Sequence, residues 1–174
     1  MVNHPHDEFY LAYGKALASW ALIEDNLCNV FCIACKMAPF GGLGRAIFFS
    51  GRSFATRADL LSAVIPLSPF ESDHQEFLKA ILKKARQFSA GRNAIAHGIP
   101  VNLHSHDESY TGPKVKEGRT SWESGGIGID ALLMAQINFN SLAEIIEQAV
   151  FPSAQREEYL LRVQALPNEA FVRG

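Results

Sequence analysis

Apolar side chains recur every three or four positions along most of this chain, a period that predicts helices rather than strands. The longest such pattern covers residues 7–37 and predicts a helix that Asp7 caps. A short apolar piece at 43–49 predicts a half-buried helical turn. Ser53 is expected to cap the next helix, which Pro66 ends. The first part of the chain is therefore expected to be helical.

A third long helix is expected to lead to the most informative motif of the chain. Ser68 and Glu71 have the spacing of a capping box, and Pro69 occupies the first helical position that would follow such a cap. The apolar pattern continues from there to His97, and Gly98 beyond it is typical of the residue that follows a helix. We expect this helix to stop at about His97.

Residues 99–129 interrupt the helical pattern with glycines and polar side chains. We predict a long loop or an irregular hairpin here, with 99–103 and 110–115 as the plausible strands. Helical pattern returns over 130–150, and Pro152 with Ser153 is expected to start a last helix that ends before residue 167. The side chains expected in the core include Trp20, Phe77 and Phe88.

Length and composition agree with one globular domain. The chain has 174 residues, of which 48% are apolar and 20% charged, enough to bury a core without disulfides or metals. We predict a single all-α domain over residues 1–174, an antiparallel helical bundle of about five helices. The irregular loop or short hairpin at about 99–129 is inserted after the third long helix.

The charge balance and the N-terminal sequence bear on partners and location. The formal net charge of −2 means that an anionic partner must be met by a local basic patch rather than by the field of the whole molecule. No basic start with an apolar h-region begins the chain, and no uninterrupted apolar run approaches the roughly 20 residues that span a bilayer. We expect a cytoplasmic protein with no membrane partner.

Three cysteines lie at helical spacing inside an apolar segment. Cys28, Cys32 and Cys35 occupy positions i, i+4 and i+7, a spacing compatible with a soft metal or with a redox pair. A fourth ligand is not near in sequence, and free cysteines of reducing compartments are among the most buried residues. Core packing is therefore the favoured interpretation, and we predict no metal and no cofactor.

Arg92, Asn93 and His97 stand together at the expected end of the third long helix. Arg92 falls on the apolar stripe, and His97 lies roughly 140° around an ideal helix from it. Asn93 and His97 are one helical step apart and can share a hydrogen bond or a ligand. The pattern places a permanent cation beside a titratable imidazole, which suits phosphate chemistry. Alternatively, these are ordinary residues that complement the dipole at a helix end.

The same helix carries a row of cations, Lys79, Lys83 and Arg86, which we call the basic stripe. Their spacing of i, i+4 and i+7, with Lys84 flanking, is suited to RNA phosphates, although such a row is often only the solvated face of a helix. Glu24 is the other oddly placed charge, inside the apolar stripe of the first helix. It is expected either to pair with an arginine, Arg92 or Arg57, or to occupy an exposed boundary position.

The inserted region holds residues that suit either a ligand site or a solvated loop. Two histidines and an aspartate could chelate a metal, and aromatics between cations could stack on bases. The competing interpretation is a polar loop whose histidines are merely solvated. The residues concerned are His104, His106, Asp107, Tyr110, Lys114, Lys116, Arg119 and Trp122.

The run from Arg92 to His97 resembles the signature of the HEPN superfamily (higher eukaryotes and prokaryotes nucleotide-binding). That signature consists of an Arg, usually a polar residue, a few variable residues and then a His. Gly98 after the His is also common there. The segment Ser19–Glu24 followed by Leu27 resembles the first helix of such domains, and Phe54–Leu61 resembles the second. The likeness is specific at the Arg–His motif and suggestive elsewhere between Asp7 and Gly98.

This resemblance implies a metal-independent endoribonuclease, of the toxin or defence kind, acting as a homodimer on single-stranded RNA. Arg92 and His97 of two copies would line a shared cleft, with His97 as general base, Arg92 stabilising phosphoryl charge and Asn93 in a secondary orienting role. An antitoxin is a possible partner. The alternatives are a non-catalytic HEPN-like module that binds a nucleotide or a protein, and a structural dimerisation unit.

Overall fold

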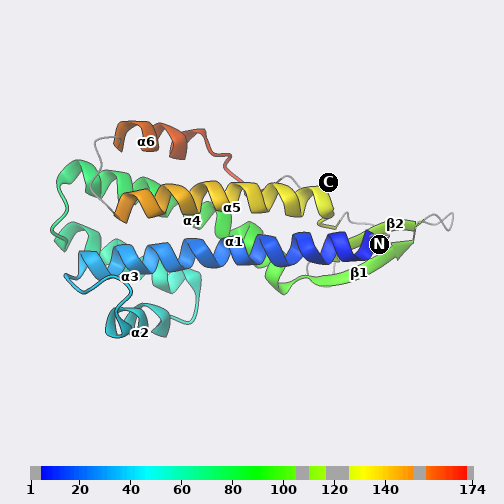
Figure 1. Ribbon diagram of the computed structural model, residues 1–174, viewed down its shortest axis with the longest axis horizontal. Coiled ribbons are helices and arrows are strands. Elements are labelled where there is room, and N and C mark those ends of the chain that lie inside the picture. The colour runs from blue at the N-terminus through cyan, green and yellow to red at the C-terminus, as the bar shows by residue number, and fades with distance from the viewer. Residues whose placement is uncertain (1–4, 105–109, 117–125, 151–155, 172–174) are drawn as a thin grey trace.

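Six α-helices and one β-hairpin make up the part of the chain that the computed structural model describes, residues 5–104, 110–116, 126–150 and 156–171 (Figure 1). The all-α class and the helical bundle are confirmed, and the short hairpin lies where the insertion was expected. The elements in chain order are α1 (Pro5–Ala34), α2 (Gly42–Ser50), α3 (Phe54–Val64), the 3-10 turn η1 (Ile65–Leu67), α4 (Ser72–His97), β1 (Ile99–His104), β2 (Tyr110–Lys116), α5 (Ile129–Val150) and α6 (Arg156–Ala165).

The long helices α1, α4 and α5 alternate in direction, so α1 and α5 lie side by side and parallel (Figure 1). The ring centroids of Trp20 and Phe139 are 5.3 Å apart, and the side-chain amide of Asn26 donates to the carbonyl of Ala143 at 2.9 Å. Residue numbers therefore rise together along both helices. The end of α4, with the Arg–His motif, lies at the end of the bundle where α1 and α5 begin, and β2 packs against α1 and α4 there.

Aromatic rings fill the centre of the bundle. Trp20 makes edge contacts with Phe54 and Phe139 at centroid distances of 4.9 and 5.3 Å. The predicted core residues Trp20, Phe77 and Phe88 are all buried. Burying large aromatic side chains is the main favourable term for a bundle of this size. Two of the three cysteines, Cys28 and Cys32, are buried in the same core, and Cys35 is half-buried, which supports core packing.

The helix starts follow local chemistry, with two corrections. Asp7 does not cap the first helix, because α1 already includes Pro5 and Asp7 lies within its first turn, where a carboxylate complements the helix dipole. The Ser53 side chain caps α3 by accepting from the Thr56 backbone N–H at 3.1 Å, as predicted. The capping box at Ser68 was wrong, because α4 begins four residues later and its N-cap, Glu71, makes no side-chain cap bond. The Ser68 hydroxyl instead donates to the Ile65 carbonyl at 2.6 Å and closes η1. The predicted start of the last helix at 152–153 lies outside the described residues.

Helix α1 also meets the length and composition of a membrane-spanning segment. Its residues 7–34 have a mean hydropathy of 1.2 over the most apolar stretch of 18 residues, and 56% of that stretch is buried inside the bundle. We predicted no spanning segment because no uninterrupted apolar run is long enough. Helix α1 nevertheless reaches a mean hydropathy of 1.2, because the average tolerates a few charged residues. The central helix of a helical bundle can have the same length and apolar composition as a membrane-spanning helix. Helix α1 occupies this central position in the bundle.

Candidate functional site

The last two turns of α4 carry Arg92, Asn93 and His97 on one continuous helix. The helix ends where the sequence predicts, and the Gly98 backbone N–H donates to the Ala94 carbonyl at 3.1 Å. Gly98 itself is extended, with φ −75° and ψ 152°, so the chain passes directly into β1 without a left-handed cap. The three candidate side chains are thus held by one rigid element, with Arg92 and His97 on different sides of it.

The Arg92 side chain is half-buried, and not all of its N–H donors have hydrogen-bond acceptors. Its Nη1 donates to the side-chain oxygen of Asn93 at 3.2 Å. Its Nε is buried and has no acceptor within the described parts of the chain. None of the ion pairs among those residues involves Arg92 either. A buried guanidinium nitrogen without an acceptor costs free energy, so the site favours a ligand that brings acceptor oxygens.

Glu24 does not neutralise Arg92, because it pairs with Arg57. The Arg57 Nη2 donates to Glu24 Oε1, and the two side chains are only 13% and 14% exposed. Arg57 Nη1 also donates to the Gly51 carbonyl at 3.0 Å. Of the two expectations for Glu24, the paired one is confirmed, with Arg57 as the partner.

Asn93 and His97 are both exposed. The side-chain amide of Asn93 is engaged with Arg92, and no hydrogen bond among the described residues joins Asn93 to His97. The structure therefore connects Asn93 to the arginine of the motif rather than to the imidazole. Neither Arg92 nor His97 lines any of three pockets that α4 forms with neighbouring segments among the described residues. Both groups lie on the surface of a single copy, available to a ligand or to a second molecule.

The basic stripe is partly neutralised by neighbouring carboxylates. Lys79 Nζ lies 2.6 Å from the Glu76 carboxylate, and Arg86 Nη2 lies 2.7 Å from that of Asp59. Lys83 is exposed and has no ion pair within the described ranges. All three cations line one open pocket of about 420 Å³ on α4. Lys83 is thus the stripe residue best placed to contact a phosphate.

Lys84, expected to flank the stripe, instead points inward. It is buried, and its Nζ donates to the carbonyls of Leu166 and Pro167 at 2.9 and 3.1 Å. Burial, and secondarily the charge of Lys83, lowers the pKa of Lys84. Its position 6.0 Å from the Phe88 ring centroid adds a cation–π contact. Lys84 therefore has a structural role, since it fastens the chain after α6 to α4.

The inserted region is described only in part. β1 and β2 pair antiparallel, from Ile99 opposite Lys116 to His104 opposite Tyr110. The predicted strands are therefore confirmed, each one residue longer. The candidates His106, Asp107, Arg119 and Trp122 lie outside the described residues. Within the described ranges, no group of three or more His, Cys, Asp or Glu side chains is arranged to hold a metal ion.

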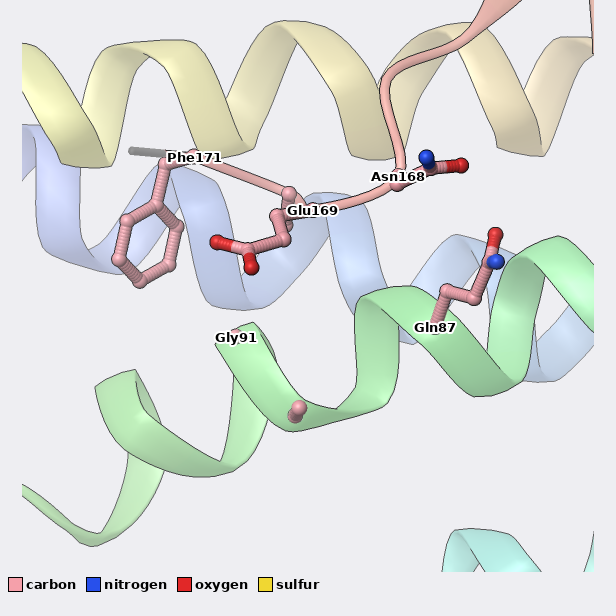
Figure 2. Close-up of a pocket in the computed structure, with 7 residues that line it drawn as sticks. Gln87, Gly91, Asn168, Glu169 and Phe171 are labelled. Carbon is pink, nitrogen blue, oxygen red and sulfur yellow. The ribbon is translucent and has the colours of Figure 1, made fainter. Parts of the chain in front are cut away.

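A pocket of about 600 Å³ lies between α4 and the chain that follows α6, a site that the sequence patterns did not reveal (Figure 2). The one sequence signal that could have pointed to it is Gly91, because a glycine inside a helix often has a packing reason, such as the close approach of another segment. The lining residues are Gln87, Ala90, Gly91, Asn168, Glu169, Ala170 and Phe171.

Comparisons of the chain with models of known protein families, with curated proteins and with solved structures found no match. The functional interpretation therefore depends on the side chains at the end of α4 and on the surfaces next to them.

Proposed function

We propose that this chain is a HEPN-like, metal-independent endoribonuclease that acts as a homodimer on single-stranded RNA. The observation that carries the proposal is the state of Arg92, which has a buried Nε without an acceptor and no carboxylate partner within the described residues. An RNA phosphate offers the oxygens that this guanidinium lacks. The exposed imidazole of His97 stands on the same helix and supplies the proton-transfer group that the chemistry needs.

The proposed reaction is a transesterification within the RNA. His97 takes the proton from a ribose 2′-hydroxyl, whose oxygen attacks the adjacent phosphorus. Arg92 stabilises the negative charge that builds on the phosphoryl oxygens. The bond between phosphorus and the 5′-oxygen breaks, and the partner's His97 protonates that oxygen. The products are a 2′,3′-cyclic phosphate and a free 5′-hydroxyl, with no metal and no cofactor required.

The placement of the two groups supports the proposed dimer. Arg92 and His97 are separated by roughly 140° around α4, and neither lines the three pockets that α4 forms with neighbouring described segments of the same copy. A twofold axis beside the end of α4 brings the Arg92 of one copy near the His97 of the other. Asn93 then acts as a positioning residue through its bond to Arg92, and Lys83 of the basic stripe contacts a distant phosphate of the same RNA.

Cleavage of single-stranded RNA in EDTA tests the proposal. Wild-type protein should cleave, and Arg92→Ala and His97→Ala should each reduce the rate by at least about 100-fold. Both positions lie at the helix end, so the helical circular dichroism signal should persist. Arg162→Ala is a matched control, because Arg162 is an exposed cation on α6 with only a 3.5 Å pair to Glu144. Loss of cleavage in one motif variant but not in the other would contradict the paired mechanism.

A second candidate is a non-catalytic HEPN-like module that binds RNA, a nucleotide or a partner protein such as an antitoxin. It is favoured by one observation, that the only described hydrogen bond of the Asn93 side chain goes to Arg92, so Asn93 does not orient the imidazole. This module would retain RNA without turnover, and Arg92→Ala would weaken binding more than His97→Ala. Turnover by the wild type would exclude it.

A further inference from the structure

Two buried polar side chains hold the irregular segment 166–171 against the bundle. Lys84 donates to the carbonyls of Leu166 and Pro167, and Asn138 Nδ2 donates to the carbonyl of Ala170 at 2.8 Å. Both donors are only 7% exposed. Hydrogen bonds from buried donors to three carbonyls fix the path of a segment that has no helical or strand pattern of its own.

Gly91 allows the same segment to lie directly on α4. A Cβ at this position would lie 2.9 Å from the Cβ of Ala170 and 3.1 Å from Cε1 of Phe171. Ala170 and Phe171 are themselves buried, so the neighbouring atoms have little room to move. The wall of the 600 Å³ pocket opposite α4 is therefore fixed by packing as well as by hydrogen bonds.

Asn168 and Glu169 lie between the residues whose carbonyls accept hydrogen bonds from Lys84 and Asn138, and their side chains supply polar groups to the pocket. Asn168 and Glu169 are exposed and line it together with Gln87 of α4 (Figure 2). The Glu169 carboxylate lies over the turn of α4 at Gly91, and the amides of Gln87 and Asn168 lie toward the start of α4 (Figure 2). Glu169 has no ion pair within the described residues. The pocket thus offers one carboxylate that only accepts hydrogen bonds and two amides that both donate and accept.

This pocket continues the surface that the proposed function assigns to RNA. Gln87 also lines the pocket of the basic stripe, and Gly91 immediately precedes Arg92. Lys83 is one helical step from Gln87 and lies on the same side of α4 as the pocket, whereas Arg92, nine positions from Lys83, faces roughly the opposite side of the helix. Lys83 and Asn168 also line one pocket together, so a strand whose phosphates contact Lys83 passes close to the mouth of the larger pocket.

We propose that the pocket binds a guanine base of the RNA, with the Glu169 carboxylate accepting from the base, an inference that rests on the proposed RNA cleavage. Guanine presents two adjacent donors, N1–H and the 2-amino group, which match the two oxygens of one carboxylate. Adenine, cytosine and uracil each place an acceptor beside their donor on that edge, and the acceptor repels a carboxylate. The side-chain amides of Gln87 and Asn168 form hydrogen bonds with the remaining polar atoms of the guanine base.

Calorimetric titration with guanosine and with adenosine tests the assignment without requiring cleavage. The wild type should bind guanosine at least about tenfold more tightly than adenosine. Glu169→Gln should remove this preference, because an amide presents one donor where two acceptors are needed. Glu158→Gln, an exposed carboxylate on α6 outside the pocket, is the matched control and should keep it. Equal affinity for the two nucleosides, or a preference that Glu169→Gln leaves intact, would overturn the assignment.

Cleavage mapping separates this inference from the proposed function. If the protein cleaves RNA without regard to guanine and Glu169→Gln cleaves at the same positions, the guanine pocket is wrong and the nuclease stands. If guanosine binds through Glu169 while no RNA is cleaved, the pocket stands and the nuclease is wrong. Arg92→Ala should keep the preference for guanosine, since Arg92 does not line the pocket.

Discussion

Glu24 forms its ion pair with Arg57 and so leaves Arg92 without a carboxylate partner in the described chain. The pairing ties α1 to α3 through two side chains that are 14% and 13% exposed. A helical bundle normally satisfies a half-buried guanidinium internally. The Nε of Arg57 and that of Arg92 are both buried without an acceptor in the described chain, but only Arg57 has a carboxylate partner, which is why we propose a ligand for Arg92.

The Glu24–Arg57 pair should contribute strongly to stability. Glu24→Ala leaves the Arg57 guanidinium largely buried without its counter-charge, and we expect a loss of about 3 kcal/mol in the free energy of unfolding in urea. Asp25→Ala is the matched control, because Asp25 pairs with Arg45 at 2.5 Å but is 39% exposed. That variant should lose less than about 1 kcal/mol. Equal losses in the two variants would contradict the structural role given to Glu24.

Replacing each of two helical glycines, Gly14 and Gly91, by alanine should change the stability of the protein in opposite directions. Gly14 of α1 has no atom within 4 Å of the place that a methyl group would occupy, so Gly14→Ala should stabilise the protein by about 0.5–1 kcal/mol through helix propensity. Gly91→Ala places a methyl 2.9 Å from Ala170, so we expect a net loss of roughly 1 kcal/mol. Thermal unfolding of both variants checks this. Stabilisation by Gly91→Ala would mean that the 166–171 segment does not lie on α4.

The thiol of Cys28 should be inert at alkaline pH. Burial, and secondarily the neighbouring Cys32, raises its pKa from an ordinary 9.0 to about 12. Between these pH values the unfolded chain has released a proton that the native state keeps, so the free energy of unfolding should fall as pH rises. An aromatic disulfide reagent at pH 9 should modify Cys35 before Cys28, and all three cysteines in urea. Equal rates in native and unfolded protein would refute core packing.

Lys84 should be needed for the pocket as well as for stability. Lys84→Met removes the donor for the Leu166 and Pro167 carbonyls, and we expect a loss of about 2 kcal/mol in the free energy of unfolding. It should also weaken guanosine binding, because Glu169 belongs to the segment that Lys84 holds. Lys83→Met, at an exposed neighbour, should cost less than about 0.5 kcal/mol. A Lys84 variant as stable as the Lys83 variant would show that these hydrogen bonds do not hold the segment.

The fold was predictable because its signals are local. Three signals depend only on neighbours in sequence: the helical period over 7–37, the cap at Ser53 and the glycine at 98. The structure has a helix over most of 7–37, a cap at Ser53 and a helix end just before Gly98. The capping box at Ser68 failed because the same serine hydroxyl has a competing local acceptor, the Ile65 carbonyl. Local signals alone do not decide between two such partners.

The candidate site was predictable only in part. The position of Arg92 on the apolar stripe follows from helical spacing, and the helix does end at His97. The inward turn of Lys84 depends on carbonyls more than 80 residues away along the chain, which spacing cannot reveal. The pocket with Glu169 depends on the same long-range packing. Contacts between segments distant in sequence account for what the patterns missed.

The most direct test of the central claim is the chemistry of the RNA ends after incubation in EDTA. Mass spectrometry of the cleaved RNA should find 2′,3′-cyclic phosphates with wild-type protein, and these should disappear with Arg92→Ala and with His97→Ala. Intact RNA with the wild type, or cyclic ends that persist when His97 is replaced, would contradict the assignment of Arg92 and His97 as the groups that cleave RNA.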